Sequence, residues 1–246
     1  MKKEEQEYWN RMVDIHWWAR GHHAIIKGLI KHYLIQKNKT NIRCLDVGCS
    51  NGNIAGFLQQ FGKAYGFDII FDSLRDCLNK NCSVLLQADA INIPFQDETF
   101  DVVTLLDVSE HVDNDYALFT EVCRVSKSSA IIFINVPAQK ILWGLHDIWN
   151  NHKRRYTKSN LKKLAKYCNL KIARLTYLHP HLFLPLLMLR LSDKIGRKKI
   201  DKRHDFFSLG GFLDDILFQT LIMEYKLVKN INFAFGTSLF ACLIKP

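Results

Sequence analysis

The chain has 246 residues, of which 48% are hydrophobic and 24% are charged, and such a composition excludes a disordered or fibrous protein and predicts a globular fold with a sizeable core. The formal net charge is +10, and residues 151–203 hold 16 Lys and Arg against only Asp193 and Asp201 as acids. This asymmetry favours an anionic partner on one face, although a solvated basic surface would give the same composition.

In chain order, the apolar periodicity predicts a helix over residues 4–36 and then an alternation of strands and helices. The predicted strands are Ile42–Val47, Ala64–Asp68, Ser83–Gln87, Asp101–Leu106, Ala130–Val136, Lys171–Tyr177 and Ser238–Ile244. The predicted helices are Asn51–Gln60, Phe71–Leu78, Tyr116–Val125, Ser159–Tyr167 (with Thr157 as its cap) and Phe212–Leu227, and residues 137–157 are predicted to form a polar and aromatic loop. The alternation indicates an α/β fold, a parallel sheet with helices on both faces.

Three units follow from this pattern. We expect an N-terminal helical lid over residues 1–40, a ligand-binding core over residues 41–177 and 236–246, and a helical insert over residues 178–235 that is first apolar and then basic.

The cysteine pattern and the apolar segments indicate the cellular compartment of the protein. The seven cysteines are odd in number and no pair has C-x-x-C spacing, so neither a disulfide framework nor a zinc site is expected. The histidines of the N-terminal region also lack partners at metal-binding spacing, and we expect no metal. The N-terminus lacks the apolar stretch of a signal peptide, and the longest later apolar run, Leu182–Leu189, is shorter than the roughly 20 residues that cross a bilayer. We therefore expect a cytoplasmic protein, with attachment to the inner face of the membrane as the alternative.

The stretch "LDVGCSNGN" (45–53) takes a predicted strand into a turn with Gly48 and Gly52. No Lys follows the second glycine, so the turn is not a P-loop, and the spacing differs from the G-x-G-x-x-G of dinucleotide sites. Because the turn opens a helix, its backbone N–H groups still point towards a polar ligand.

Acidic residues close the strands that follow. Asp68 ends the second strand, where a carboxylate can accept hydrogen bonds from both hydroxyls of a ribose, so we expect the ligand to contain a nucleoside. Asp89 and Ala90 follow the third strand and suit the edge of an adenine ring, and Asp107 follows the fourth. Open α/β sheets bind their ligands at these strand ends.

Four stretches, "LDVGCSNG", "YGFD", "QADAINIPFQDETFDVVTLLDVSEHV" and "VCRVSKSSAIIFINVP", together resemble the ordered motifs of class I S-adenosylmethionine-dependent methyltransferases, and more narrowly the type 11 branch. The resemblance covers about residues 8–178 and the last strand. It implies a Rossmann-like fold whose mostly parallel seven-stranded sheet ends in an antiparallel strand, and a cofactor that leaves as S-adenosylhomocysteine.

The resemblance also implies roles for single residues. Gly48, Cys49, Ser50 and Gly52 would line the methionine and ribose portion of the cofactor, and Asp46 would hold the loop and help to meet the amino group. Asp68, with Ile69 beside it, would bind the ribose, and Asp89 and Ala90 the adenine. Asp107 and Val108 would flank the methionine end, with Glu110 and His111 at the mouth of the pocket and Arg20 at the cofactor carboxylate. Many relatives have glycine in place of Ser50, and serine is tolerable there if its backbone angle is ordinary.

The acceptor side is expected in "LWGLHDIWNNHKRRYT" (142–157). Transfer to a hydroxyl needs a base, and histidine suits that role. His146 and His111 are the candidate bases, and the candidate acceptor contacts are Trp143, His146, His152, Arg155 and Tyr156. The alternative is a loop tied down by its own side chains, with Arg155 paired to Asp147 and Tyr156 packed as an anchor. Trp17, Trp18 and Arg20 are candidates for a lid over the pocket, although Trp17 alone is better explained as a core residue.

The insert carries an apolar segment, residues 177–191, next to "SDKIGRKKIDKR" (192–203) with its six basic residues. This pairing suits a membrane surface with anionic lipid, or a phosphorylated lipid-linked acceptor. The alternative is a cap whose apolar face packs on the sheet.

Three functions therefore remain open. The first is methylation of a small-molecule, lipid-linked or glycan-linked acceptor, most simply at oxygen. The second is RNA methylation, prompted by the basic segment, although Asp107-Val-Ser-Glu stands after the fourth strand in place of an amino-methylating Asn-Pro-Pro-Tyr-type motif. The third is a non-catalytic scaffold of the same fold.

Overall fold

A seven-stranded sheet forms the centre of the computed structural model, which describes residues 16–36, 41–78, 84–195 and 210–246. The strand order is β3-β2-β1-β4-β5-β7-β6. The strands are β1 (Ile42–Val47), β2 (Gly62–Asp68), β3 (Val84–Gln87), β4 (Phe100–Leu106), β5 (Ser126–Pro137), β6 (Lys171–Leu178) and β7 (Ser238–Ile244). β7 runs antiparallel to β5 and β6, and the other pairs are parallel. The predicted fold class is confirmed, including the antiparallel last strand.

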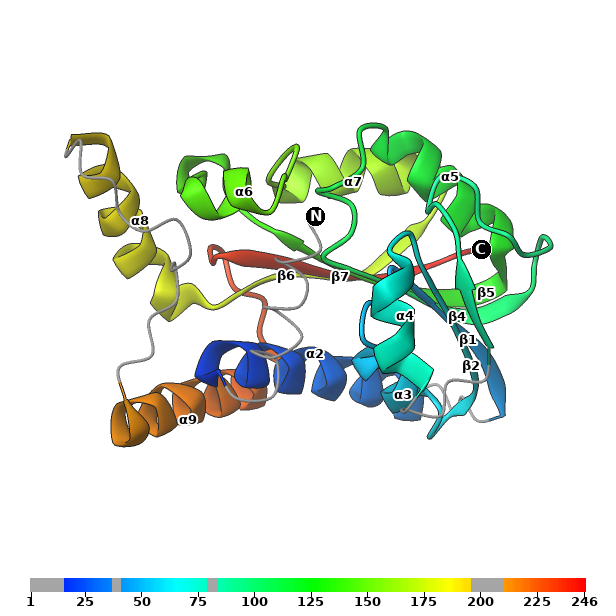
Figure 1. Ribbon diagram of the computed structural model, residues 1–246, viewed down its shortest axis with the longest axis horizontal. Coiled ribbons are helices and arrows are strands. Elements are labelled where there is room, and N and C mark those ends of the chain that lie inside the picture. The colour runs from blue at the N-terminus through cyan, green and yellow to red at the C-terminus, as the bar shows by residue number, and fades with distance from the viewer. Residues whose placement is uncertain (1–15, 37–40, 79–83, 196–209) are drawn as a thin grey trace.

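Helices cover both faces of this sheet (Figure 1). They are α2 (Trp17–Gln36), α3 (Asn53–Leu58), α4 (Phe71–Leu78), α5 (Asp115–Val125), α6 (Leu145–Trp149), α7 (Lys158–Tyr167), α8 (Pro180–Ile195) and α9 (Gly211–Val228). One buried apolar cluster joins α5 and α7 to the sheet, and a second joins α2, α3 and α9 to its other face. Trp17 is buried in the second cluster, as a core residue.

One predicted loop contains short helices instead. Residues 137–157 include the 3-10 helix η1 (Lys140–Leu142) and α6. The Asp147 carboxylate accepts a hydrogen bond at 2.9 Å from the backbone N–H of Gly144, which stabilises the start of α6 in a stretch with no long apolar period. The expected helix over residues 4–36 is described only from Trp17 onwards, because residues 1–15 lie outside the described part of the chain.

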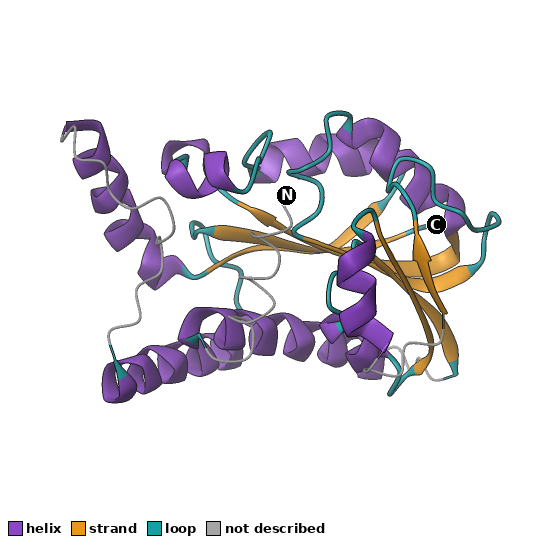
Figure 2. Cartoon of the chain, in the orientation of Figure 1, coloured by secondary structure: helices purple, strands orange, loops and turns teal. Residues whose placement is uncertain are grey.

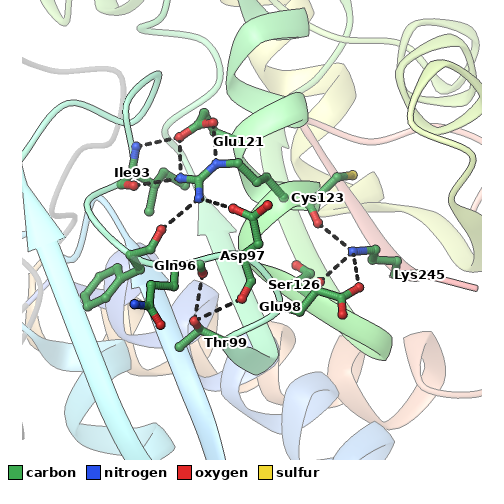
Figure 3. Close-up of polar contacts among 11 residues, drawn as sticks. Ile93, Gln96, Asp97, Glu98, Thr99, Glu121, Cys123, Ser126 and Lys245 are labelled. Carbon is green, nitrogen blue, oxygen red and sulfur yellow. Dashed lines mark hydrogen bonds and ion pairs between the residues drawn. The ribbon is translucent and has the colours of Figure 1, made fainter.

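Arg124 of α5 fixes the segment that follows β3 (Figure 3). Its guanidinium donates to both carboxylate oxygens of Glu121, to Asp97, and to the backbone carbonyls of Ile93 and Phe95. The Ile93 N–H also donates to Glu121 at 2.8 Å. This segment begins with residues 88–91, so the network positions the strand end at which an adenine contact is expected.

Two glycines bring α2 and α9 into close contact. A Cβ atom at Gly21 would lie 2.2 Å from Leu221 Cδ1 and 2.8 Å from Leu221 Cβ, and one at Gly28 would lie 2.5 Å from Tyr225 Cε2. The glycines are two helical turns apart, on one face of α2. The insert helix α9 is therefore docked on the N-terminal helix through positions that tolerate no side chain.

The other insert helix, α8, touches the core through Leu182, which packs against the second buried cluster. Figure 2 shows α8 and one end of α9 extending beyond the last strands. Leu184, Met188 and Leu191 of α8 are exposed, while Arg190 on the opposite side donates to the Leu142 carbonyl at 3.1 Å. Arg190 thus adds a polar contact to η1, while Leu184, Met188 and Leu191 are left in solvent. No helix among the described residues is long and apolar enough to cross a membrane.

We predict that Gly21→Ala destabilises the protein by about 1–3 kcal/mol, because the new methyl group collides with Leu221 and overpacking outweighs the gain in helix propensity of about 1 kcal/mol. Thermal and denaturant unfolding would measure the change. Gly211→Ala is the matched control, since a Cβ at Gly211 meets nothing within 4 Å. Equal stability of the two variants would contradict the close helix contact.

Candidate functional site

A cavity of about 690 Å³ opens at the carboxyl ends of β1, β2, β3 and β4. Its size is that of a small-molecule or cofactor site. Most of the residues expected at a cofactor line it: Asp46, Gly48, Cys49, Ser50, Asp68, Ile69, Asp89, Ala90, Asp107 and Val108. His111, His146, His152 and Arg155, expected on the acceptor side, line the same cavity.

The glycine turn forms the floor of the cavity. Gly48 has φ +68°, and a Cβ on it would lie 2.6 Å from Val108 Cγ2. Gly52, at φ +75°, begins α3, and its N–H donates to the Cys49 carbonyl at 2.8 Å. Gly52 is not among the lining residues, so it shapes the turn without reaching the ligand space.

Ser50 does not have the ordinary backbone angle that would make it a simple replacement for glycine. Its φ is +46°, in the left-handed region, which costs a side-chain-bearing residue roughly 1–2 kcal/mol. In this conformation its N–H points at Asp68 Oδ2, at 2.9 Å. The turn is therefore held by the carboxylate of the next strand, and this bond offsets the strain.

Asp68 is held on both oxygens. Oδ2 accepts from Ser50 N and Oδ1 from Ile70 N, each at 2.9 Å. Burial raises the pKa of this carboxyl, while the backbone N–H groups act in the opposite direction. Each oxygen keeps a lone pair for a further donor, so the fixed carboxylate can still receive two ligand hydroxyls.

Asp46 is a deeply buried acid of the cavity. Its side chain is 3% exposed, and Thr104 Oγ1 donates to Oδ1 at 2.6 Å. Burial raises its pKa to about 7, although the bond from Thr104 lowers it. A cationic group in the cavity would favour the ionised form.

Asp89 sits at the far end of the row of strand ends. Its Oδ1 accepts from Ile91 N at 3.1 Å, an Asx turn that leads the chain into the segment fixed by Arg124. The side chain is exposed and lines the cavity together with Ala90. A carboxylate next to a backbone N–H is thus available there to a ligand.

Asp107 connects the cavity to a buried chain of polar groups. Its Oδ1 accepts from Asn135 Nδ2 at 2.8 Å, and His22 Nε2 lies 3.6 Å from Oδ2. His22 Nδ1 is 2.7 Å from His179 Nε2, and His179 Nδ1 is 3.2 Å from Glu224 Oε2. Desolvation raises the pKa of Asp107, but the bonds and charges of His22 and Asn135 outweigh it, and the net shift is downward.

This series of buried polar contacts was hard to predict, because its members come from distant segments. His22 comes from α2, His179 follows β6, and Glu224 comes from α9. Asn135 was open to detection, because a polar residue inside the apolar strand "AIIFINVP" indicates a buried hydrogen bond. Trp18, stacked on His22 at 5.0 Å between ring centres, also lines the cavity.

At the opposite wall, a second polar group surrounds Asp147. Arg155 Nε donates to Asp147 Oδ1 at 2.8 Å, and His152 Nδ1 lies 2.9 Å from the same oxygen. Burial opposes ionisation of Asp147, but His152 and Arg155 hold its pKa well below the usual range. Arg155 therefore pairs with Asp147, as in the alternative of a loop tied down by its own side chains. His152 and Arg155 nevertheless both line the cavity.

Glu110 and His111 lie between these two groups. Burial, and next the charge of Asp107, raise the pKa of Glu110 well above its usual value. Burial, and next the nearby His152, lower the pKa of His111 to about 4. His111 is therefore neutral near pH 7 and accepts a proton poorly.

Besides Gly52, three residues expected at the ligand do not line the cavity. The guanidinium of Arg20 lies 4.6 Å over the Phe218 ring of α9, because the exposed side of α2 carries it away from the pocket. Tyr156 is buried, with its hydroxyl 3.0 Å from Asp115 Oδ2, so it packs as an anchor. Trp143 ends η1, where its N–H donates to the Lys140 carbonyl.

Comparison with known proteins agrees with this geometry. Residues 45–134 match the family described as "Methyltransferase domain". The chain is 31% identical to an uncharacterized protein of Methanocaldococcus jannaschii over 100 residues, covering 41% of this chain and 43% of that protein. It is also 31% identical to the demethylmenaquinone methyltransferase of Roseiflexus castenholzii over 109 residues, covering 41% and 46%. The chain thus spans less than half the length of the curated relatives it matches.

The fold is also that of a solved S-adenosylmethionine-dependent methyltransferase from Archaeoglobus fulgidus. The TM-score is 0.56 over 89% of this chain and 94% of that one, at 19% identity. Residues 45–134 are therefore similar to a methyltransferase domain, and the chain has the fold of the Archaeoglobus fulgidus enzyme. The Archaeoglobus fulgidus enzyme depends on S-adenosylmethionine, and the cavity of this chain carries Asp46, Asp68 and Asp107 at its strand ends.

We predict that Asp46→Asn removes a pH dependence of stability. Because burial raises the pKa of Asp46 in the folded protein to about 7, whereas an unperturbed Asp carboxyl has a pKa of about 3.9, the folded protein holds one more proton than the unfolded chain between these values. The stability due to the neutral carboxyl is complete below about pH 4 and is lost as the pH rises through about 7, with a slope of up to about 1.4 kcal/mol per pH unit.

Denaturant unfolding of both proteins across this range tests the prediction. The free energy of unfolding of the wild type should fall more steeply with pH than that of the variant. Parallel curves would show that Asp46 titrates normally.

Proposed function

We propose that the protein transfers the methyl group of S-adenosylmethionine to an oxygen of a small-molecule, lipid-linked or glycan-linked acceptor. The observation that carries the proposal is the convergence of Asp46, Asp68, Asp89 and Asp107, from four successive strand ends, on one cavity that also contains a histidine cluster. A structural role for each acid alone would not bring all four to the same cavity.

In this proposal Asp68 binds the ribose, and Asp89 with Ala90 meets the adenine. Asp46 and Asp107 face the methionine end, where the cofactor carries its positive charge. Gly48 lets the ligand approach the backbone, since a side chain there would collide with Val108. The cofactor supplies an activated methyl group with a good leaving group, so the chain's own residues mainly position the acceptor and exclude water.

Transfer to a hydroxyl also requires removal of a proton. His111 is a weak base because of its low pKa. His146 lines the cavity, and Asn150 Nδ2 lies 3.2 Å from its Nε2. We assign the proton-accepting role to His146, and acceptor positioning to His152 and Arg155, which Asp147 holds in place.

The outer surface of the insert favours a lipid-linked acceptor presented at an anionic membrane. Leu184 and Met188 of α8 are 61% and 64% exposed, and Phe212 of α9 is 78% exposed. Leu186, on the inner side of α8, lines the cavity. An apolar helix surface of this kind, followed in sequence by six basic residues over 192–203, is suited to anionic lipid next to the pocket. Residues 196–209 lie outside the described part of the chain. Peripheral contact of a cytoplasmic protein with the inner face of the membrane is part of the proposal.

RNA methylation is the second candidate, because the 151–203 segment is strongly basic. The exposed apolar residues of α8 and α9 favour lipid over RNA, since an RNA surface would be polar and charged. A scaffold without catalysis would need no proton acceptor in the pocket.

We predict that Asp68→Asn weakens binding of S-adenosylhomocysteine at least tenfold, because the amide loses the charge and one acceptor, and with them the bond that holds Ser50. Calorimetric titration measures the loss. Asp72→Asn, on the neighbouring helix and not among the cavity-lining residues, is the control and should bind normally. Equal affinity of the wild type and Asp68→Asn for S-adenosylhomocysteine would show that Asp68 does not bind the cofactor.

We further predict that the protein sediments with phosphatidylglycerol vesicles at low salt and that the double variant Phe212→Ser, Leu213→Ser releases it. Loss of two apolar side chains from the lipid should lower partitioning by about tenfold or more. Tyr167→Ser, which removes a 62% exposed side chain from α7 on the other face of the sheet, should have no effect. Absence of wild-type sedimentation would exclude the membrane contact.

A further inference from the structure

Three potential metal ligands meet inside the cavity, next to the proposed proton acceptor. Glu110, His111 and His152 each offer one ligand atom, and these atoms all lie within 4.8 Å of one another. Glu110 and His111 follow β4, and His152 follows α6. All three residues line the cavity, so the cluster opens to the space where an acceptor would lie.

Both imidazoles are held from outside the cluster. His152 Nδ1 lies 2.9 Å from Asp147 Oδ1, which leaves Nε2 as its ligand atom. His111 lies next to the backbone of Asn150, an interaction that raises its pKa against the larger effect of burial. Histidines that bind metal almost always donate their second N–H to a carboxylate or a backbone carbonyl in this way.

Glu110 supplies an independent observation. Its side chain is only 1% exposed, and its Oε2 has no hydrogen-bond partner among the described residues. A buried carboxyl oxygen without a partner is costly. A cation bound between Glu110 and the two histidines would satisfy it.

We propose that Glu110, His111 and His152 bind a divalent transition-metal ion such as Zn²⁺. Two imidazole nitrogens and one carboxylate oxygen suit Zn²⁺ or a neighbouring metal better than Mg²⁺, which prefers oxygen ligands. In a tetrahedral zinc site the ligand atoms are about 3.4 Å apart, so the metal draws these side chains together. Three protein ligands leave a position open towards the cavity, as in catalytic metal sites.

The proposed role rests on the proposed function and deepens it. An acceptor hydroxyl bound at the open position loses its proton more readily, since a metal ion lowers the pKa of an oxygen it holds. The proton passes to His146, whose ring centre is 5.8 Å from that of His152. An oxygen lone pair then forms the new O–C bond, while the carbon–sulfur bond breaks and its electron pair stays on sulfur, which leaves a neutral thioether.

Metal binding is tested on the full chain, free of any affinity tag and stripped with a chelator. Titration with Zn²⁺, followed by calorimetry, and with Co²⁺, followed by visible absorption, should show about one ion per chain bound with nitrogen ligands. Glu110→Gln and His152→Ala should each weaken binding at least tenfold, since each removes a direct ligand. His32→Ala removes an imidazole that lies further along α2 and is not among the cavity-lining residues, and this variant should bind normally.

Absence of saturable binding in the wild type, or equal binding by Glu110→Gln, would overturn the proposal. Thermal unfolding without metal shows whether the Glu110→Gln and His152→Ala chains are folded, and S-adenosylhomocysteine titration of the same samples separates the two proposals. Cofactor binding without metal binding would refute the proposed metal site and leave the proposed function standing. Metal binding without cofactor binding would refute the proposed function and leave the metal site standing.

Discussion

Removal of carboxylates from water at neighbouring strand ends is the constraint on which the site depends. Asp46 and Asp68 are almost completely buried, and Asp107 faces the cavity between His22 and Asn135. Negative charge gathered in this way is unfavourable unless donors or cations compensate it. Backbone N–H groups of the glycine turn compensate part of it, at Asp68. The negative charge that is not compensated determines what the cavity can bind. A suitable ligand has hydroxyl groups at one end and positive charge at the other.

The same constraint ties the outer helices to the pocket. From Asp107 the buried contacts run through His22 to His179 and Glu224, and they connect α2, the end of β6 and α9. The glycine contacts of α2 with α9 secure the same pair of helices. Any movement of α9 would therefore be transmitted through these contacts to Asp107 in the cavity. The insert helix α9 is thus joined to the cavity through the fold itself.

The sheet and the row of acids could be predicted from the sequence, because both follow from local sequence patterns. Apolar strands alternate with helices, and a ligand site at the strand ends follows from parallel topology. The features that could not be predicted depend on contacts between segments that are distant in the chain. The direction of Arg20 is set by Phe218, almost 200 residues away in the chain. The cluster of Glu110 with His152 joins residues whose separation matches no metal motif, and the angle of Ser50 follows from its bond to Asp68.

The most direct test of the account is transfer of a labelled methyl group from S-adenosylmethionine into a fractionated cell extract, with Asp68→Asn as the blank. The account predicts label in the lipid fraction or in small molecules with a free hydroxyl, and none with the variant. Label in RNA would contradict the acceptor that the exposed apolar helices indicate. No label in any fraction from a protein that still binds the cofactor would contradict methyl transfer itself.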